Sequence, residues 1–134
     1  MAKISDIEGI GPAFAEKLTA AGVRSVEKLL KTGATKQGRK ALSESTGIDE
    51  QKILAWTNMA DLFRIKGVAA QYAELLEAAG VDTVKELRNR NAANLHAKMK
   101  EVNDQKKRVR QLPSLSQVER FIEDAKKLEP MISH

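Results

Sequence analysis

The chain has 134 residues, of which 42% are hydrophobic, 31% are charged and 4% are aromatic, a length that suits one domain or two very small ones. It has no cysteine and no run of 18 apolar residues, which excludes disulfide scaffolds, thiolate metal sites and membrane spans, so we expect a cytoplasmic protein. The 23 basic and 18 acidic residues give a net charge of +5, which favours an anionic partner only mildly because the two signs are interspersed.

The first predicted elements lie in "IEGIGPAFAEKLTAAGVRSVEKLL", from Ile7 to Leu30. Pro12 is tolerated in the first turn of a helix, and the apolar residues that follow recur at helical spacing. The helix is expected to end at Gly22, because glycine tolerates the positive φ of a helix end. Ser25 can cap a second, short helix over "VEKLL". A third helix is expected over "TKQGRKALSEST".

A longer helix comes next, capped by Asp49 and free of glycine and proline as far as Ile65. Its apolar residues cover more than half of its circumference, so we expect it to be buried on more than one side, as a strut between the parts of the chain that flank it. They are Ile53, Leu54, Trp56, Met59, Ala60, Leu62 and Phe63. The only tryptophan, Trp56, is therefore expected in the core and not on a base-stacking surface.

The opening segment returns later in the chain as "IKGVAAQYAELLEAAGVDTVKEL", from Ile65 to Leu87. It is identical to Ile7–Leu29 at 11 of 23 positions without a gap. We interpret this match as an internal duplication and predict the same chain path for the two segments, in two units packed face to face. In the second copy, "NAANLHAKMKEV" takes the place of the third helix of the first copy.

The last predicted helix begins between Pro113 and Ser116 and is ended by Pro130. Two pairs have capping-box spacing, Ser114 with Gln117 and Ser116 with Glu119. Its apolar stripe, which we expect to pack onto the duplicated core, comprises Leu115, Val118, Phe121, Ile122, Ala125 and Leu128. No segment shows sustained alternation of apolar and polar residues, so the predicted fold class is all-α.

"IEGIGPAFAEKL" resembles the helix-hairpin-helix motif of DNA polymerases, ligases and repair proteins. With the duplication, the linking helix and the "LPSLSQVERFIEDAKKL" ending, nearly the whole chain resembles a small bacterial family that is catalogued as a domain of unknown function with tandem helix-hairpin-helix units. The resemblance implies a first unit over residues 1–48, a linking helix over 49–64, a second unit over 65–112 and a packing helix over 113–130, all in one compact globule.

The resemblance also implies that a hairpin at Gly9, Ile10 and Gly11 offers backbone amides to a nucleic-acid phosphate. Ile10 would then fill the core, and Lys17 in the following helix would lie near the phosphate. The flanking acids Asp6 and Glu8 oppose phosphate binding. The alternative for both glycines is a structural turn between two packed helices.

The second hairpin, at Lys66, Gly67 and Val68, departs from the pattern. Ala69 replaces the second glycine and Ala70 replaces the proline, so a methyl group obstructs the approach of a phosphate. Arg64 and Lys66 lie beside this hairpin in the sequence and favour an anion. It is expected either to bind phosphate weakly or to serve in packing only.

A basic segment, "KMKEVNDQKKRVR", holds most of the excess positive charge. Its bases are Lys98, Lys100, Lys106, Lys107, Arg108 and Arg110, and with Glu101 and Asp104 they leave a local charge of +4. Charge concentrated in this way is what nonspecific phosphate binding requires. The alternative is a solvated helix surface. No aromatic residues are interleaved with these bases, so stacking of single-stranded bases is not supported.

No catalytic constellation is present in the sequence. His96 and His134 have no matching carboxylate cluster, and no serine lies in a nucleophile-elbow context. We therefore expect no catalytic residue, no metal ligand, no cofactor and no small-molecule substrate. The sequence favours a non-enzymatic module that binds DNA without sequence preference. The alternative is an adaptor that binds another protein and has kept the fold but lost phosphate binding.

Overall fold

The computed structural model describes residues 3–7, 9–106 and 109–133, so Lys107 and Arg108 of the expected site, and the acid Glu8 that flanks the first hairpin, lie outside the described residues. The chain divides into two compact units. Unit 1 comprises Met1–Asp61 with Met131–His134, and unit 2 comprises Leu62–Pro130. Every regular element in the described residues is a helix, apart from an isolated antiparallel bridge between Lys3 and Ser25, which confirms the all-α prediction.

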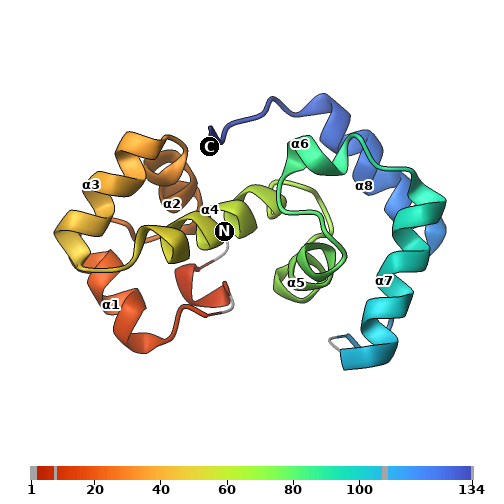
Figure 1. The fold of residues 1–134 in the computed structure, drawn as a ribbon, viewed down its shortest axis with the longest axis horizontal. Helices are drawn as coiled ribbons and strands as arrows, with labels where there is room; N and C mark the ends of the chain where they lie inside the picture. Colours follow the sequence, from red (N-terminus) through yellow and green to blue (C-terminus); the bar gives the residue numbers. More distant parts are fainter. Residues whose placement is uncertain (1–2, 8, 107–108, 134) are drawn as a thin grey trace. The chain divides into compact units, whose positions relative to one another are not determined.

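Unit 1 begins with a 3-10 turn and continues with α-helices (Figure 1). Its elements are η1 (Ile4–Asp6), α1 (Pro12–Ala20), α2 (Val26–Gly33), α3 (Lys36–Thr46) and α4 (Glu50–Leu62), of which only Leu62 is counted with unit 2. The long helix ends at Leu62, two residues before the end of the linking helix expected over 49–64. After Leu62 the chain turns, and the N–H of Ile65 donates to the carbonyl oxygen of Leu62 over 3.1 Å, because the backbone must enter the positive φ of Gly67.

The caps of α1 and α2 agree with the sequence analysis. Gly22 has a φ of +89°, and the N–H of Val23 donates to the carbonyl oxygen of Leu18 over 2.8 Å, which closes the end of α1. The hydroxyl of Ser25 accepts the N–H of Lys28 over 3.1 Å at the start of α2. The end of α1 and the start of α2 are therefore capped by residues that are close neighbours in the sequence.

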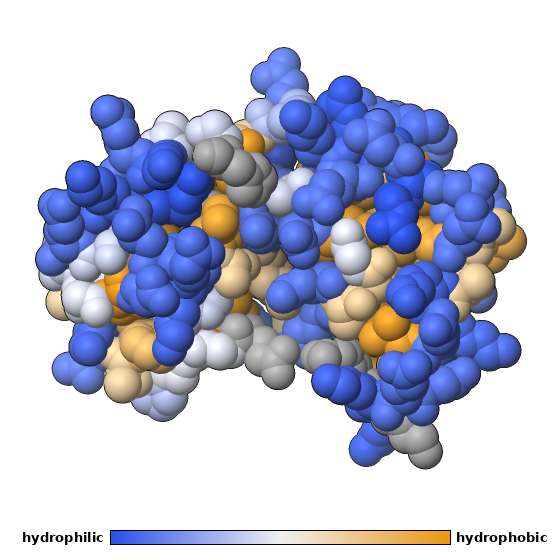
Figure 2. Space-filling model, in the orientation of Figure 1, coloured by the Kyte–Doolittle hydropathy of each residue, from blue (hydrophilic) through white to orange (hydrophobic). Residues whose placement is uncertain are grey.

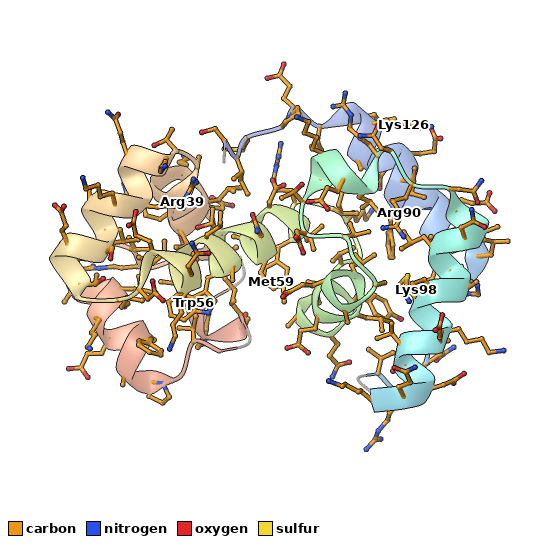
Figure 3. All side chains as sticks on the ribbon, viewed as in Figure 1. Arg39, Trp56, Met59, Arg90, Lys98 and Lys126 are labelled. Carbon is orange, nitrogen blue, oxygen red and sulfur yellow. The ribbon has the colours of Figure 1, made fainter. Side chains whose placement is uncertain are left out.

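The core of unit 1 is built around α4. Ile53, Thr57 and Ala60 are at most 1% exposed, and Trp56 and Met59 are also buried, so the prediction of burial on more than one side is confirmed. Trp56 is 5% exposed and extends from α4 toward α1 (Figure 3), which confirms its predicted place in the core.

The described residues of unit 2 form the helices α5 (Ala70–Ala78), α6 (Val84–Leu87), α7 (Ala92–Lys106) and α8 (Leu115–Lys127). The capping box of α8 uses the first of the two expected pairs. The N–H of Gln117 donates to the Ser114 hydroxyl over 3.1 Å, and the N–H of Ser114 donates to Gln117 Oε1 over 2.8 Å. α8 packs on α6 and α7 through the buried members of the predicted stripe, Val118, Phe121, Ile122 and Ala125. Leu115, the first member of the stripe, is 40% exposed.

Candidate nucleic-acid interface

The first hairpin depends on a glycine at position 9. Gly9 has a φ of +92°, which disfavours any side chain, and a Cβ at this position would lie 3.2 Å from Nε1 of Trp56. Ile10 is 4% exposed, as the hairpin resemblance implies, and its N–H donates to the carbonyl oxygen of Ile7 over 3.2 Å. The fold itself therefore accounts for Gly9, and the amide of Ile10 is already used within the protein.

Gly11 is different. Its φ of −78° and ψ of 178° are ordinary extended values, and a Cβ here would meet no atom within 4 Å. Gly11 is exposed at the N-cap of α1, where glycine is acceptable but not preferred over serine or asparagine. Neither backbone strain nor packing within the protein accounts for a glycine at this position, and its absent side chain leaves open space above the hairpin.

The start of α1 has free backbone donors. Within the described residues, the N–H groups of Gly11, Ala13 and Phe14 have no protein acceptor, and the N–H of Ala15 is the first to bond, to Gly11 over 2.9 Å. Free N–H groups at a helix start, combined with the helix dipole, favour an anion.

Two lysines lie close to this helix start. The ammonium groups of Lys17 and Lys52 lie 6.0 Å and 4.8 Å from the centre of the Phe14 ring, which packs against Trp56 with the ring centroids 5.2 Å apart. Lys52 comes from α4 and was missed by the sequence analysis. Lys52 is the only basic residue of α4 as the structure bounds it, Glu50–Leu62. The carboxylate of Asp6 accepts the N–H of Lys3 over 2.9 Å, so part of its hydrogen-bonding capacity is used in η1.

The second hairpin has the same dependence on its first glycine. Gly67 has a φ of +90°, and a Cβ there would lie 3.3 Å from the ring of Phe121. Val68 is buried, and its N–H donates to Ile65 over 3.1 Å. Ala69 is exposed and extended at the N-cap of α5, with a φ of −101°. Its methyl group therefore occupies the place that Gly11 leaves open.

The start of α5 offers one more donor than the start of α1, because Ala70 has the N–H that Pro12 lacks. Within the described ranges, the N–H groups of Ala69, Ala70, Gln71 and Tyr72 have no protein acceptor. Lys66 is exposed beside them. Compared with the start of α1, the start of α5 thus has more backbone donors but less open space for an anion.

The first two lysines of the basic segment do not lie together along α7. Lys98 and Lys100 are two positions apart, which is about 200° around a helix, so they do not share a face. Lys98 also lies 3.7 Å from the carboxylate of Glu101. Lys106 is exposed at the end of α7, and Lys107 and Arg108 lie outside the described residues.

The loop after α7 brings Arg110 to the second hairpin. Asn103 holds the loop with two hydrogen bonds, accepting the N–H of Val109 over 3.0 Å and donating to its carbonyl oxygen over 3.1 Å. The hydroxyl of Tyr72, in the first turn of α5, donates to the carbonyl oxygen of Gln111 over 3.3 Å. Arg110 is exposed between these two attachments, so its charge is held close to the start of α5.

The surplus positive charge belongs mostly to unit 2. By sequence, unit 2 has 14 basic and 10 acidic residues, whereas unit 1 has nine and eight. On the face shown in Figure 2, hydrophilic residues predominate and apolar residues appear in separate small areas. The large hydrophobic side chains exposed in the described residues are Leu115 and Met131, which belong to different units. The described surface therefore offers positive charge more readily than a broad apolar patch.

Groups of three or more metal-ligating side chains are absent from the part of the chain that the structure describes. The ring of His96 lies 3.0 Å from the carbonyl oxygen of Pro113, where it fastens the loop before α8. No helix among the described residues is long and apolar enough to span a bilayer.

Comparison with protein families matches residues 8–128 to the family described as a domain of unknown function, DUF4332. The chain belongs to the DUF4332 family. The expected membership of a family of unknown function is thus confirmed. No curated protein and no solved structure matches this DUF4332 chain.

Proposed function

We propose that this DUF4332 chain is a non-enzymatic module that binds the phosphate backbone of DNA without sequence preference. The observation that carries the proposal is Gly11, an exposed glycine that neither its φ nor its neighbours require, at a helix start where three N–H groups have no acceptor among the described residues. A phosphate oxygen that approaches the backbone closely gives a reason for the missing side chain. Lys17 and Lys52 supply positive charge beside it.

We further propose that the two units are duplicated helix-hairpin-helix units. Equivalent positions of the two matching segments have similar geometry, with φ of +92° and +90° at Gly9 and Gly67 and φ of +89° and +95° at Gly22 and Gly80. The hydrogen bond from Val23 to Leu18 is 2.8 Å long, and the bond from Val81 to Leu76 is 2.9 Å long. These agreements support one ancestral unit with a turn, a helix, a glycine cap and a short second helix.

The duplication extends, we infer, to α4 and α8, both of 13 residues. Trp56 of α4 and Phe121 of α8 each pack against the first glycine of a hairpin. Each also contacts the aromatic residue in the first turn of another helix of its unit, Phe14 for Trp56 and Tyr72 for Phe121. On this view α8 is the second copy of α4, and the loop with the basic residues is an insertion specific to unit 2.

In the proposed complex, backbone N–H groups position the phosphate, and the basic side chains supply most of the affinity. Free N–H groups and lysines contact phosphates, which are present in every sequence, so no strong sequence preference is expected. In unit 2, the exposed Arg110, which is held close to the start of α5, adds attraction at the second hairpin. Two weak phosphate sites on one chain gain affinity when both engage the same strand.

Binding to a labelled duplex should weaken steeply as salt is added. If about four phosphates are engaged, the slope of log K against log salt concentration is expected near −3.6. The measurement is a titration of the full chain against duplex DNA, single-stranded DNA and RNA at two salt concentrations. Absence of binding to all three nucleic acids at about 50 mM salt would reject the proposal. It would favour the alternative function, an adaptor that binds another protein.

A matched pair of charge reversals tests the basic segment. Lys107→Glu with Arg108→Glu is expected to weaken binding and to reduce the magnitude of the slope by about 1.8, equivalent to two phosphate contacts. Lys126→Glu with Lys127→Glu makes the same change in net charge at two exposed residues of α8 and serves as the control. Equal effects of the two pairs would show that binding follows net charge alone.

Gly11→Ala separates binding from stability. The free energy of unfolding is expected to change by less than about 1 kcal/mol, because the poorer N-cap is offset by the lower entropy of the unfolded chain. The affinity for duplex DNA is expected to fall, because the added methyl group obstructs the close approach of a phosphate oxygen to the backbone N–H groups. Ala69→Gly is the reciprocal variant and should raise the affinity by a similar factor. Unchanged DNA affinity in Gly11→Ala would contradict the role given to Gly11.

A further inference from the structure

The end of α2 lacks the cap that three other helices have. α1, α3 and α5 are followed by glycines of positive φ, Gly22, Gly47 and Gly80. α2 is followed by Ala34, whose φ of −62° and ψ of −32° are right-handed helical values. The last carbonyl groups of a helix have no partner within it, so those of α2 need donors from elsewhere.

Two groups distant in sequence supply these donors. One amino group of Arg39 donates to the carbonyl oxygen of Gly33 over 2.8 Å, and the N–H of Ser133 donates to the carbonyl oxygen of Ala34 over 2.8 Å. The other amino group of Arg39 donates to the carbonyl oxygen of Ser133 over 2.8 Å. Arg39, labelled in Figure 3, is 5% exposed although it is charged. The segment Met131–Ser133 is therefore held by both the N–H and the carbonyl group of one residue.

The corresponding short helix of unit 2 provides a comparison. After α6, Arg88 is also right-handed helical, with a φ of −64° and a ψ of −18°. There the chain caps itself, because the N–H of Asn89 donates to Glu86 over 3.2 Å and the N–H of Arg90 donates to Leu87 over 3.1 Å. Among the described residues, the end of α6 is thus capped by its immediate neighbours, whereas the end of α2 is capped by a distant segment.

We propose that Met131–Ser133 is a strap that docks on the turn between α2 and α3 of its own chain and serves as a removable cap of α2. Arg39 is the latch, by which we mean that its planar guanidinium group donates hydrogen bonds both to the end of α2 and to the strap. Recognition is of the main chain, so the site accepts an extended peptide backbone. The strap follows unit 2 along the chain but is counted with unit 1, which makes the end of α2 depend on a segment that is distant in the sequence.

The test uses amide hydrogen exchange of the full chain by NMR. The Ser133 amide is expected to exchange at least about tenfold more slowly than in an unstructured peptide. Ser133→Pro removes the N–H donor without changing α2 or α3, and the amides of the last turn of α2 should then exchange faster. Ser133→Ala keeps the N–H and loses only the hydroxyl, which lies 3.4 Å from the Ala34 carbonyl, so it should behave like the wild type.

Arg39→Lys tests the latch. It keeps the charge but not the planar pair of amino groups, so the protection of Ser133 should be lost while the amides of Leu29 and Leu42 in the core remain protected. An unprotected Ser133 amide in the wild type would overturn the proposal, as would unchanged exchange in Ser133→Pro. Protection that rises with protein concentration, together with a dimer in size-exclusion chromatography, would overturn docking within one chain and assign the strap to a second copy.

Discussion

Trp56→Ala is expected to lower the free energy of unfolding of unit 1 by about 3–5 kcal/mol. The side chain is 5% exposed, so its loss removes apolar area from the core and leaves a cavity beside Phe14. It also removes the group against which Gly9 packs. Equilibrium unfolding in urea, followed by far-UV circular dichroism, measures the change.

Trp56→Phe is the matched control, because unit 2 places Phe121 in the comparable position against Gly67. It is expected to cost less than Trp56→Ala, since the ring is kept and only part of the volume is lost. The wild-type tryptophan should fluoresce with a blue-shifted maximum. A loss below about 1 kcal/mol in Trp56→Ala would contradict the burial of this residue.

Gly33→Ala is expected to destabilise unit 1 by about 1–3 kcal/mol through overpacking. A Cβ on Gly33 would overlap the hydroxyl of Thr57 and lie 3.1 Å from its methyl group. Thr57 has no room to move, because it is fully buried in α4 and its hydroxyl donates to the carbonyl oxygen of Ile53 over 2.7 Å. The usual gain from replacing glycine in a helix is therefore outweighed by the clash.

A double-mutant cycle isolates this contact. Thr57→Ala removes the hydroxyl and the γ-methyl group and leaves only the Cβ of residue 57, 3.2 Å from the new methyl group, so Gly33→Ala should cost much less in that background. Gly11→Ala, where a Cβ meets no neighbour, is the control for the general effect of adding a methyl group to a glycine. Additive free energies in the cycle would show that Gly33 does not pack against Thr57.

Local patterns predicted the helices well because their signals are short-range. The cap at Ser25, the end at Gly22 and the box at Ser114 each involve residues that are close neighbours in the sequence. The end of α4 was missed because the residues after Leu62 are not helix breakers. The turn there is set by the hairpin that follows, as the positive φ of Gly67 shows.

The candidate site was less predictable because its features depend on tertiary contacts. Sequence alone could not distinguish Gly9 from Gly11, since the difference is what a Cβ would meet: Trp56 in one case and open space in the other. Lys52 comes from a helix that is distant in sequence from the ring of Phe14 that it approaches. The local charge of the basic segment also gives no information on direction, because Lys98 and Lys100 point to different sides of α7.

The aromatic contacts of the hairpin glycines also bear on the order of folding. The chain forms α1, α2 and α3 between Gly9 and Trp56, and it forms α5, α6 and α7 between Gly67 and Phe121. Each hairpin therefore acquires its full packing only after the last helix of its unit has docked, whereas the helix caps can form from neighbouring residues alone. Closing such long loops delays these contacts relative to local ones. During synthesis, the second hairpin would consequently reach its final shape only after α8 had been made.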